Sequence, residues 1–215
     1  VVYTTGSWPE VVVSGEFTGD SRLDVAMTTS YDFTPAQDNR VLLFDQLITG
    51  VLANTQALPA GLDPTAVSRG DFNFDGLDDL AVINQSEDTL GVFLQSVAGN
   101  WPDMITYPTQ ATPDGLTRGD FNGDMRDDIA VSYSASQVVS VFYQNFSGTF
   151  NTPIHLAFAN GGFNDISSGD LNGDGWDDLV VLRGAGYHTD QVAVFYQQDH
   201  MLSAPIFRTV QDGAY

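Results

Sequence analysis

A short block of sequence occurs four times in the chain, and this repeat constrains the fold more than any other feature. The copies are GEFTGDSRLDVAM from Gly15, GDFNFDGLDDLAV from Gly70, GDFNGDMRDDIAV from Gly119 and GDLNGDGWDDLVV from Gly169. Successive copies begin 55, 49 and 50 residues apart, and a second repeated block, of which VSVFYQ is typical, follows each one. A fixed period of about fifty residues is typical of repeat architectures.

Both repeated blocks have the character of β-strands. They are short, rich in Val, Ile, Phe and Tyr, and bounded by Gly, Asn, Asp and Pro. The apolar residues do not alternate cleanly with polar ones, so both faces of each sheet are expected to be covered. Helical repeats would need a 3.6-residue period, which the chain does not show. We therefore predict an all-β chain, a β-propeller or an open run of its blades, built of four blades with about four antiparallel strands each. The recurrent Phe44, Phe93, Phe142 and Phe195 are expected in the core, and Trp101 and Trp176 in packing between blades.

The repeat also sets the expected domain boundaries. Residues 1–10 reach the first loop too soon to form a full repeat, so they are predicted to be an N-terminal extension or a closing strand. Residues 11–215 are predicted to be a single propeller domain of four repeats, at about 11–64, 65–113, 114–163 and 164–215.

The charge of the chain is strongly negative. Its 28 acidic residues, 25 of them Asp, stand against seven arginines and no lysine, which gives a formal net charge of −21. Such a field opposes binding to nucleic acid and to anionic membranes. No apolar run approaches the roughly 20 residues of a membrane helix, so no membrane insertion is expected. A lysine-poor acidic surface could reflect adaptation to salt, but the placement of the aspartates has a more local explanation.

Within each copy of the first block, oxygen-bearing side chains stand at positions 1, 3, 5 and 9 of a loop. Alternate side chains of a tight turn can converge on one point, and Ca²⁺ takes six to eight oxygen ligands. Turn propensity alone would not require carboxylates at matching places. Position 12 is valine in the last three copies, so these are not EF-hands, which need a glutamate there. The predicted ligands, with position 7 contributing its backbone carbonyl, are Glu16, Thr18, Asp20, Arg22 and Asp24 in a weaker loop 1; Asp71, Asn73, Asp75, Leu77 and Asp79 in loop 2; Asp120, Asn122, Asp124, Arg126 and Asp128 in loop 3; and Asp170, Asn172, Asp174, Trp176 and Asp178 in loop 4.

Two of the loops begin inside an Arg-Gly-Asp tripeptide, which adhesive proteins present to cell-surface receptors. Asp71 and Asp120 are the aspartates concerned. The other two copies have Ser-Gly-Asp and Ser-Gly-Glu, so the arginine varies while the acid persists. An aspartate that points into its own loop cannot also reach a receptor, and we interpret the tripeptide as accidental.

The pattern GDFNGDxxxDDIAV followed by VSVFYQNxxGTF resembles the FG-GAP (integrin α-subunit-like) repeat and its bacterial VCBS-type relatives. The resemblance covers the chain from about Val11. It implies a β-propeller, usually of seven blades, with Ca²⁺ in the loop between the first two strands of a blade. This chain has four repeats, so it is expected to be a four-bladed ring, part of a larger seven-bladed propeller, or half of a dimer that closes one. The resemblance also implies adhesion receptors, lectins or accessory domains of secreted enzymes, and therefore does not fix function.

A ligand is expected at the end of the blades opposite the metal loops, where the loops deviate from the repeat. The proposed contacts there are Tyr31, Phe33, Phe163, Tyr187 and His188. No catalytic constellation is visible, because the three histidines have no recurring partner and Ca²⁺ is a weak Lewis acid. We expect an extracellular or cell-surface recognition module for a protein or glycan, with self-assembly into a surface layer or filament as the alternative.

Overall fold

The computed structural model describes residue 5 and residues 8–30, 38–96, 99–157, 162–184 and 191–209. The chain forms two compact units, Val1–Thr109 (the N-terminal unit) and Gln110–Tyr215 (the C-terminal unit), each described by itself below. The boundary between them lies within the predicted second repeat, and the prediction of a single domain over residues 11–215 stays a prediction.

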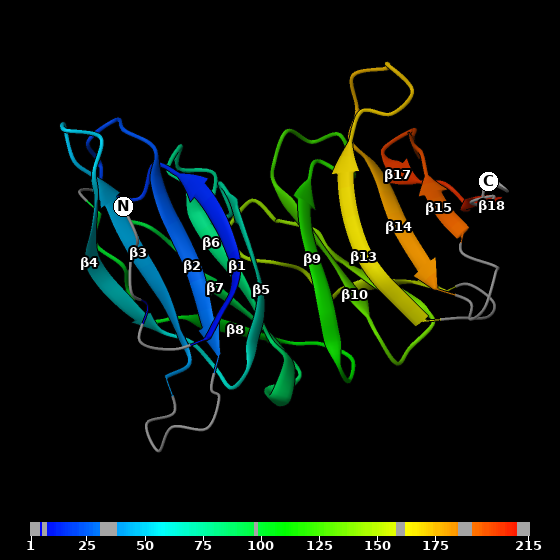
Figure 1. Ribbon diagram of the computed structural model, residues 1–215. Coiled ribbons are helices and arrows are strands. Elements are labelled where there is room, and N and C mark those ends of the chain that lie inside the picture. The colour runs from blue at the N-terminus through cyan, green and yellow to red at the C-terminus, as the bar shows by residue number, and fades with distance from the viewer. Residues whose placement is uncertain are drawn as a thin grey trace, which may run out of the picture. The chain divides into compact units, whose positions relative to one another are not determined.

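Each unit holds two four-stranded antiparallel sheets, which are the predicted blades (Figure 1). In every blade the strands are hydrogen-bonded in chain order. Blade 1 consists of β1 (Trp8–Gly15), β2 (Asp24–Ser30), β3 (Arg40–Gln46) and β4 (Leu52–Pro59); blade 2 of β5 (Pro64–Gly70), β6 (Asp79–Asn84), β7 (Thr89–Phe93) and β8 (Ile105–Pro108); blade 3 of β9 (Pro113–Gly119), β10 (Asp128–Tyr133), β11 (Val138–Phe142) and β12 (Ile154–Ala157); and blade 4 of β13 (Gly162–Gly169), β14 (Asp178–Gly184), β15 (Gln191–Phe195) and β18 (Ile206–Thr209).

Two features depart from this regular order. Blade 4 carries an extra hairpin, β16 (Gln197–Gln198) and β17 (Met201–Leu202), between its third and fourth strands. In blade 2 a 3₁₀ turn, η1 (Gln85–Glu87), joins the second strand to the third. Strand β1 begins at Trp8, so the last three residues of the predicted extension 1–10 belong to the first blade.

The second strand of a blade is its most buried element, which explains its continuous apolar sequence. Strands β6 and β10 are buried at every position, as expected for a strand with other structure on both faces. In both strands the first residue is an aspartate paired with the glycine that ends the preceding strand. This pairing closes the loop end of the hairpin and fixes where loops 2 and 3 begin and end.

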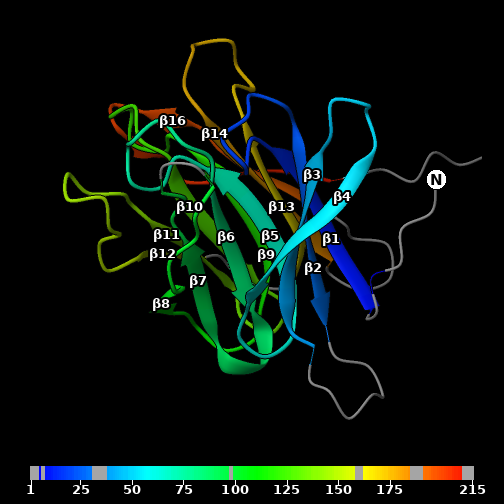
Figure 2. The same cartoon turned by 90° about the vertical axis from the view of Figure 1, so that its left-hand side faces the viewer.

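Within each unit the core lies between the two blades. Strand β1 runs beside β5 in one unit and β9 beside β13 in the other (Figure 1), and Figure 2 shows the strands of blade 2 from a second side. The four predicted core phenylalanines are buried. Trp101 packs on the core of the N-terminal unit, its ring centre 6.2 Å from that of Phe17, as predicted. The two cores are Phe17, Ala26, Val41, Leu43, Leu58, Val67, Leu80, Val82 and Phe93, and Phe121, Ala130, Val139, Val141, Ile166, Leu179, Val181, Ala193 and Phe195.

Candidate metal loops and an adjoining pocket

The four loops share one backbone conformation despite their different sequences. Positions 4 and 6 are left-handed in every loop. Glycine suits this conformation, but position 6 is Ser21 in loop 1 and Met125 in loop 3, with φ of 67° and 65°. Phe74 takes the same conformation at position 4 of loop 2, with φ of 61°. Each such residue costs roughly 1–2 kcal/mol, so other interactions must hold the turns in shape.

The acid at position 1 supplies part of that stabilisation. In loop 3 the two carboxylate oxygens of Asp120 accept hydrogen bonds from the backbone N–H groups of Asp124 and Met125, at 3.0 and 2.7 Å. Asp71 does the same in loop 2. Both Arg-Gly-Asp aspartates therefore point into their own loops, as predicted. In loop 1 Glu16 reaches three backbone N–H groups with one carboxylate oxygen.

The acid at position 9 joins the loop to the third strand of its blade. One of its oxygens accepts from the N–H of position 2 and the other from the N–H of a glutamine at the end of the third strand or two residues beyond it. The distances are 2.8–3.1 Å to the first donor and 2.7–2.9 Å to the second. All four aspartates, Asp24, Asp79, Asp128 and Asp178, are fully buried. Sequence reasoning found these residues but missed this role.

Burial makes the charge of these carboxylates costly. It raises the pKa of Asp79 to about 7, while backbone N–H donors act to lower it and the carboxylates of Asp75 and Asp71 raise it further. The pKa of Asp128 is raised to about 8 by the same combination, with Asp124 and Asp120 as the neighbouring acids. Positions 1, 5 and 9 are thus close enough to repel one another. A hard cation held among these oxygens would relieve the repulsion, so the donor set fits Ca²⁺.

In loop 3 the guanidinium of Arg126 lies beside one of the predicted calcium ligands, Asp124. The Arg126 side chain turns back so that Nη2 contacts the Asp124 carboxylate, and Nε donates to the Gln144 carbonyl at 3.4 Å. Its Cζ lies 4.0 Å from the centre of the Phe146 ring. Loop 1 repeats the arrangement, with Arg22 on Asp20 and on the equivalent carbonyl.

Loops 2 and 4 have no basic residue at position 7. There the corresponding oxygen of Asp75 or Asp174 accepts from a neutral amide, that of Asn73 at 3.0 Å or of Asn172 at 2.8 Å. The loops therefore form two classes, one with an internal guanidinium and one without.

Loop 1 gains a carboxylate that the sequence pattern did not predict. Asp20, Asp24 and Asp45 can each place one oxygen within 4.8 Å of the others. Asp45 stands at the end of β3, where the other repeats carry Leu94, Tyr143 or Tyr196. An acid at a position that is otherwise apolar was the available signal. Its Oδ1 is also 3.8 Å from the Arg22 guanidinium.

Neighbouring blades of a unit are linked through their loops. Asp78 of blade 2 accepts a hydrogen bond from the Glu16 N–H of blade 1, at 2.8 Å, and Gln95 donates to the carbonyls of both residues. In the C-terminal unit Asp177 of blade 4 accepts from the Asp120 N–H of blade 3, at 3.0 Å. The position 1 residue is thus held by the following blade as well as by its own loop.

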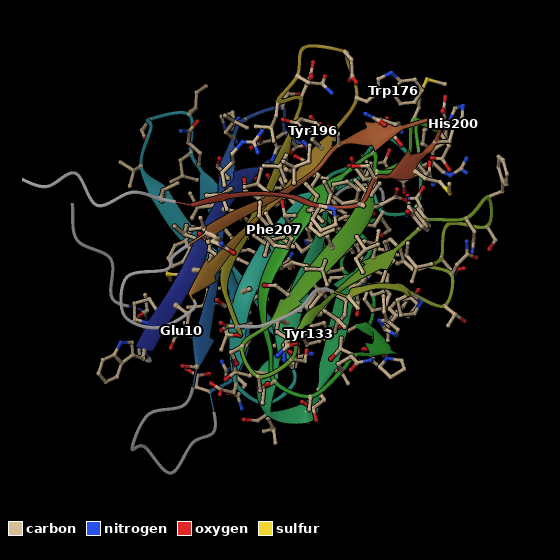
Figure 3. The ribbon with its side chains drawn as sticks, turned by 90° about the vertical axis from the view of Figure 1, so that its right-hand side faces the viewer. Glu10, Tyr133, Trp176, Tyr196, His200 and Phe207 are labelled. Atoms are coloured by element: carbon tan, nitrogen blue, oxygen red, sulfur yellow. The ribbon has the colours of Figure 1, made fainter. Side chains whose placement is uncertain are left out.

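A pocket of about 430 Å³ adjoins loop 4. The indole of Trp176 and the imidazole of His200 meet edge to face in its wall, with ring centres 5.3 Å apart (Figure 3). Trp176 also covers Gly123 of blade 3, as the prediction of packing between blades required. It nevertheless stays 36% exposed and lines the pocket. The remaining wall is formed by Asp174, Gln197, Gln198 and Asp199.

The contact of His155 with a serine is structural. Its Nδ1 lies 2.9 Å from Ser140 Oγ, which also accepts a hydrogen bond from the Tyr133 hydroxyl at 2.7 Å. Ser140 is fully buried and pairs with His155 across neighbouring strands. A serine enclosed in this way cannot meet a substrate.

The residues predicted to contact a ligand are not tested by the structure. Tyr31, Phe33, Tyr187 and His188 lie outside the described residues. Phe163 lies in β13, where its backbone pairs with Arg183. The pocket at Trp176 is at the opposite end of the blade, because it adjoins the first-to-second and third-to-fourth connections.

Comparison with known families decides what kind of repeat this is. The FG-GAP-like repeat matches residues 71–131 and again residues 120–181, together just over half of the chain. The chain belongs to the FG-GAP-like repeat family. The two matches run from loop 2 to β10 and from loop 3 to β14, so each spans one whole FG-GAP-like period. Loop 1, where Glu16 and Thr18 depart from the pattern, lies outside both.

The chain also shares its fold with solved structures. One similar structure is a lectin from Agrocybe aegerita, described for its specific recognition of non-reducing terminal N-acetylglucosamine. It is 16% identical, with a TM-score of 0.61 over 91% of this chain and 51% of the lectin, so the chain spans about half the lectin's length. The predicted all-β propeller fold with four FG-GAP-like blades is confirmed. No curated protein matches the chain. Among the described residues, no helix has the length and apolar character needed to cross a membrane.

Proposed function

We propose that this protein is an extracellular, calcium-stabilised β-propeller that acts as a recognition module for a protein or glycan ligand. The observation that carries the proposal is the common geometry of the four loops. Each one carries oxygen-bearing side chains at positions 1, 3, 5 and 9 of a turn whose backbone is left-handed at two positions, and the aspartate at position 9 is always buried. Such a donor set suits a hard cation with oxygen ligands.

The residues that would hold Ca²⁺ are those at positions 1, 3, 5 and 9 together with the carbonyl at position 7. When bound, the ion would offset the repulsion among the carboxylates and brace each hairpin. Loops of this kind generally require the calcium levels found outside cells, which favours an extracellular location. A role in recognition, not catalysis, is supported by the burial of Ser140, the serine that contacts His155.

Calcium is expected to raise the melting temperature of the full chain. Ligand at one hundred times its dissociation constant adds about 2.7 kcal/mol per site to the free energy of unfolding. Scanning calorimetry in millimolar Ca²⁺ and in chelator measures the shift, with equal Mg²⁺ as a control for ionic strength. Overlapping curves in calcium and chelator would refute the structural role of the metal.

Replacing Arg126 by leucine is expected to tighten calcium binding at loop 3 about tenfold, equivalent to about 1.4 kcal/mol. The guanidinium contacts the Asp124 carboxylate and repels a divalent ion placed beside it, so its removal frees a ligand oxygen and eliminates a like charge. Calorimetric titration with a competing chelator measures the affinity.

Arg118→Leu is the matched control for this change. It removes the same charge from the same blade, but Arg118 pairs with Asp127, at 2.9 Å, and not with a predicted ligand. A general effect of net charge would tighten binding equally in both variants. That result would contradict the role assigned to Arg126.

A further inference from the structure

We propose that the pocket beside loop 4 binds a neutral terminal sugar residue; this rests on the proposed function and names its ligand and its site. The wall is formed by two segments, loop 4 with Asp174 and Trp176, and the hairpin β16–β17 with its turn at Asp199 and His200. Both segments lie in the C-terminal unit and meet at one end of blade 4 (Figure 3).

The two aromatic rings are held firmly in the pocket wall. A Cβ added at Gly123 would lie 1.6 Å from the Trp176 ring, so the indole rests directly on the backbone of blade 3. His200 is oriented by a 2.8 Å hydrogen bond to the Asn122 carbonyl and by its edge-to-face contact with Trp176. Pre-positioned rings bind a ligand at a low cost in conformational entropy.

The hydrogen bond of His200 determines which nitrogen remains for a ligand. A carbonyl can only accept, so Nδ1 carries the proton in this contact. In the neutral ring Nε2 is then an acceptor. The turn that presents the ring has two consecutive non-glycine residues in the left-handed conformation, Asp199 with φ of 49° and His200 with φ of 66°. Such backbone strain is maintained only by its surroundings and occurs often at binding sites.

Gln197 adds a buried donor without a partner. Its side chain is 1% exposed and lines the pocket, and its Nε2 has no hydrogen-bond partner among the described residues. The equivalent nitrogen of Gln95 in blade 2 donates to two backbone carbonyls, at 2.9 and 3.1 Å. A buried polar group left unpaired costs about 1–3 kcal/mol, which a ligand oxygen would recover.

The chemistry of the wall selects the class of ligand. Two carboxylates and no lysine or arginine among the described lining residues disfavour an anionic ligand. A neutral sugar presents an apolar C–H face to the indole, hydroxyl donors to Asp199 and to His200 Nε2, and an oxygen acceptor to Gln197. The volume is near the lower end for ligand pockets, which suits one or two sugar rings.

A cationic side chain is the main competitor, since carboxylates and an indole also attract ammonium groups. The sugar is favoured because Asp174 is also a predicted calcium ligand. With the ion bound, this carboxylate no longer provides free negative charge for a cation.

The test uses the full chain in millimolar calcium. Saturation-transfer NMR is recorded with the methyl glycosides of glucose, galactose, mannose, N-acetylglucosamine and N-acetylgalactosamine, and with hexylamine as the cationic probe. We expect at least one glycoside to receive saturation and hexylamine to receive none. Calorimetry then gives the dissociation constant of the strongest glycoside.

Three variants locate the binding. Trp176→Ala and His200→Gly are each expected to weaken the glycoside at least tenfold; glycine retains the left-handed turn and removes only the ring. Met201→Ala, in the same hairpin but outside the pocket wall, is expected to leave the dissociation constant unchanged. Calcium-dependent melting is measured in every variant, so that a lost binding site is distinguished from a lost fold.

Two results would overturn the proposal. One is the absence of saturation on all five glycosides while calcium still raises the melting temperature, which would leave the proposed function standing. The other is binding of hexylamine in place of the sugars. A missing calcium shift in the wild-type chain would instead refute the proposed function itself.

Discussion

Replacing Asp24 by asparagine is expected to lower the free energy of unfolding by about 3 kcal/mol. The Asp24 carboxylate is fully buried and accepts three hydrogen bonds, from the N–H groups of Phe17 and Gln46 and from the Thr18 hydroxyl, at 2.9–3.0 Å. Asparagine has the same shape but offers one oxygen and a second group that can only donate. At least one buried N–H would therefore lose its acceptor and face another donor. Urea denaturation in chelator measures the effect without any contribution from metal.

The control for this prediction is Glu87→Gln. It makes the same change from acid to amide in the same unit, at an exposed residue of η1. An exposed substitution of this kind is expected to change the free energy of unfolding by less than about 0.5 kcal/mol. If Asp24→Asn unfolds at the same urea concentration as Glu87→Gln, the hydrogen bonds of Asp24 do not stabilise the link between the loop and β3.

Replacing Phe121 by alanine is expected to cost about 3–5 kcal/mol, the second large effect. Phe121 occupies position 2 of loop 3, is completely buried and belongs to the core between blades 3 and 4. Truncation would remove most of its apolar surface and leave a cavity that the rigid sheets can fill only partly.

The chain contains its own control for this substitution. Leu171 occupies the same position in loop 4 but is 52% exposed, so Leu171→Ala is expected to cost less than about 1 kcal/mol. Urea denaturation followed by circular dichroism compares the two. Equal losses would show that position 2 acts through the loop backbone and not through the core.

The sequence predicted the blades well because repetition supplied the information four times. The strand at VSVFYQ and the loop before DDIAV are each short and ambiguous when taken alone, but four aligned copies fix their order and boundaries. The acids of the loops were found for the same reason. The alignment could not show which groups the side chains contact. Both oxygens of Asp128 accept hydrogen bonds from backbone N–H groups, and one of these donors follows β11, which is remote in sequence.

The features that differ between copies were the hardest to predict. Asp45 and the fold-back of Arg126 each occur against the pattern of the repeat, and their contacts depend on the packing of a neighbouring strand. The pocket wall at His200 comes from a hairpin present in one blade only. The Trp176 side chain was assigned to packing alone, because its position in the repeat gives no information about the space beside the ring.

Two hydrogen bonds between blades, from the Glu16 N–H to Asp78 and from the Asp120 N–H to Asp177, limit how the molecule can be shortened. A fragment with one blade would leave either the carboxylate acceptor or the N–H donor of this hydrogen bond without its partner. It would also expose its half of the apolar core that lies between the two blades. Truncation and grafting into other scaffolds should therefore proceed in steps of two blades, because a pair of blades is the smallest segment that keeps both this hydrogen bond and the core between its sheets.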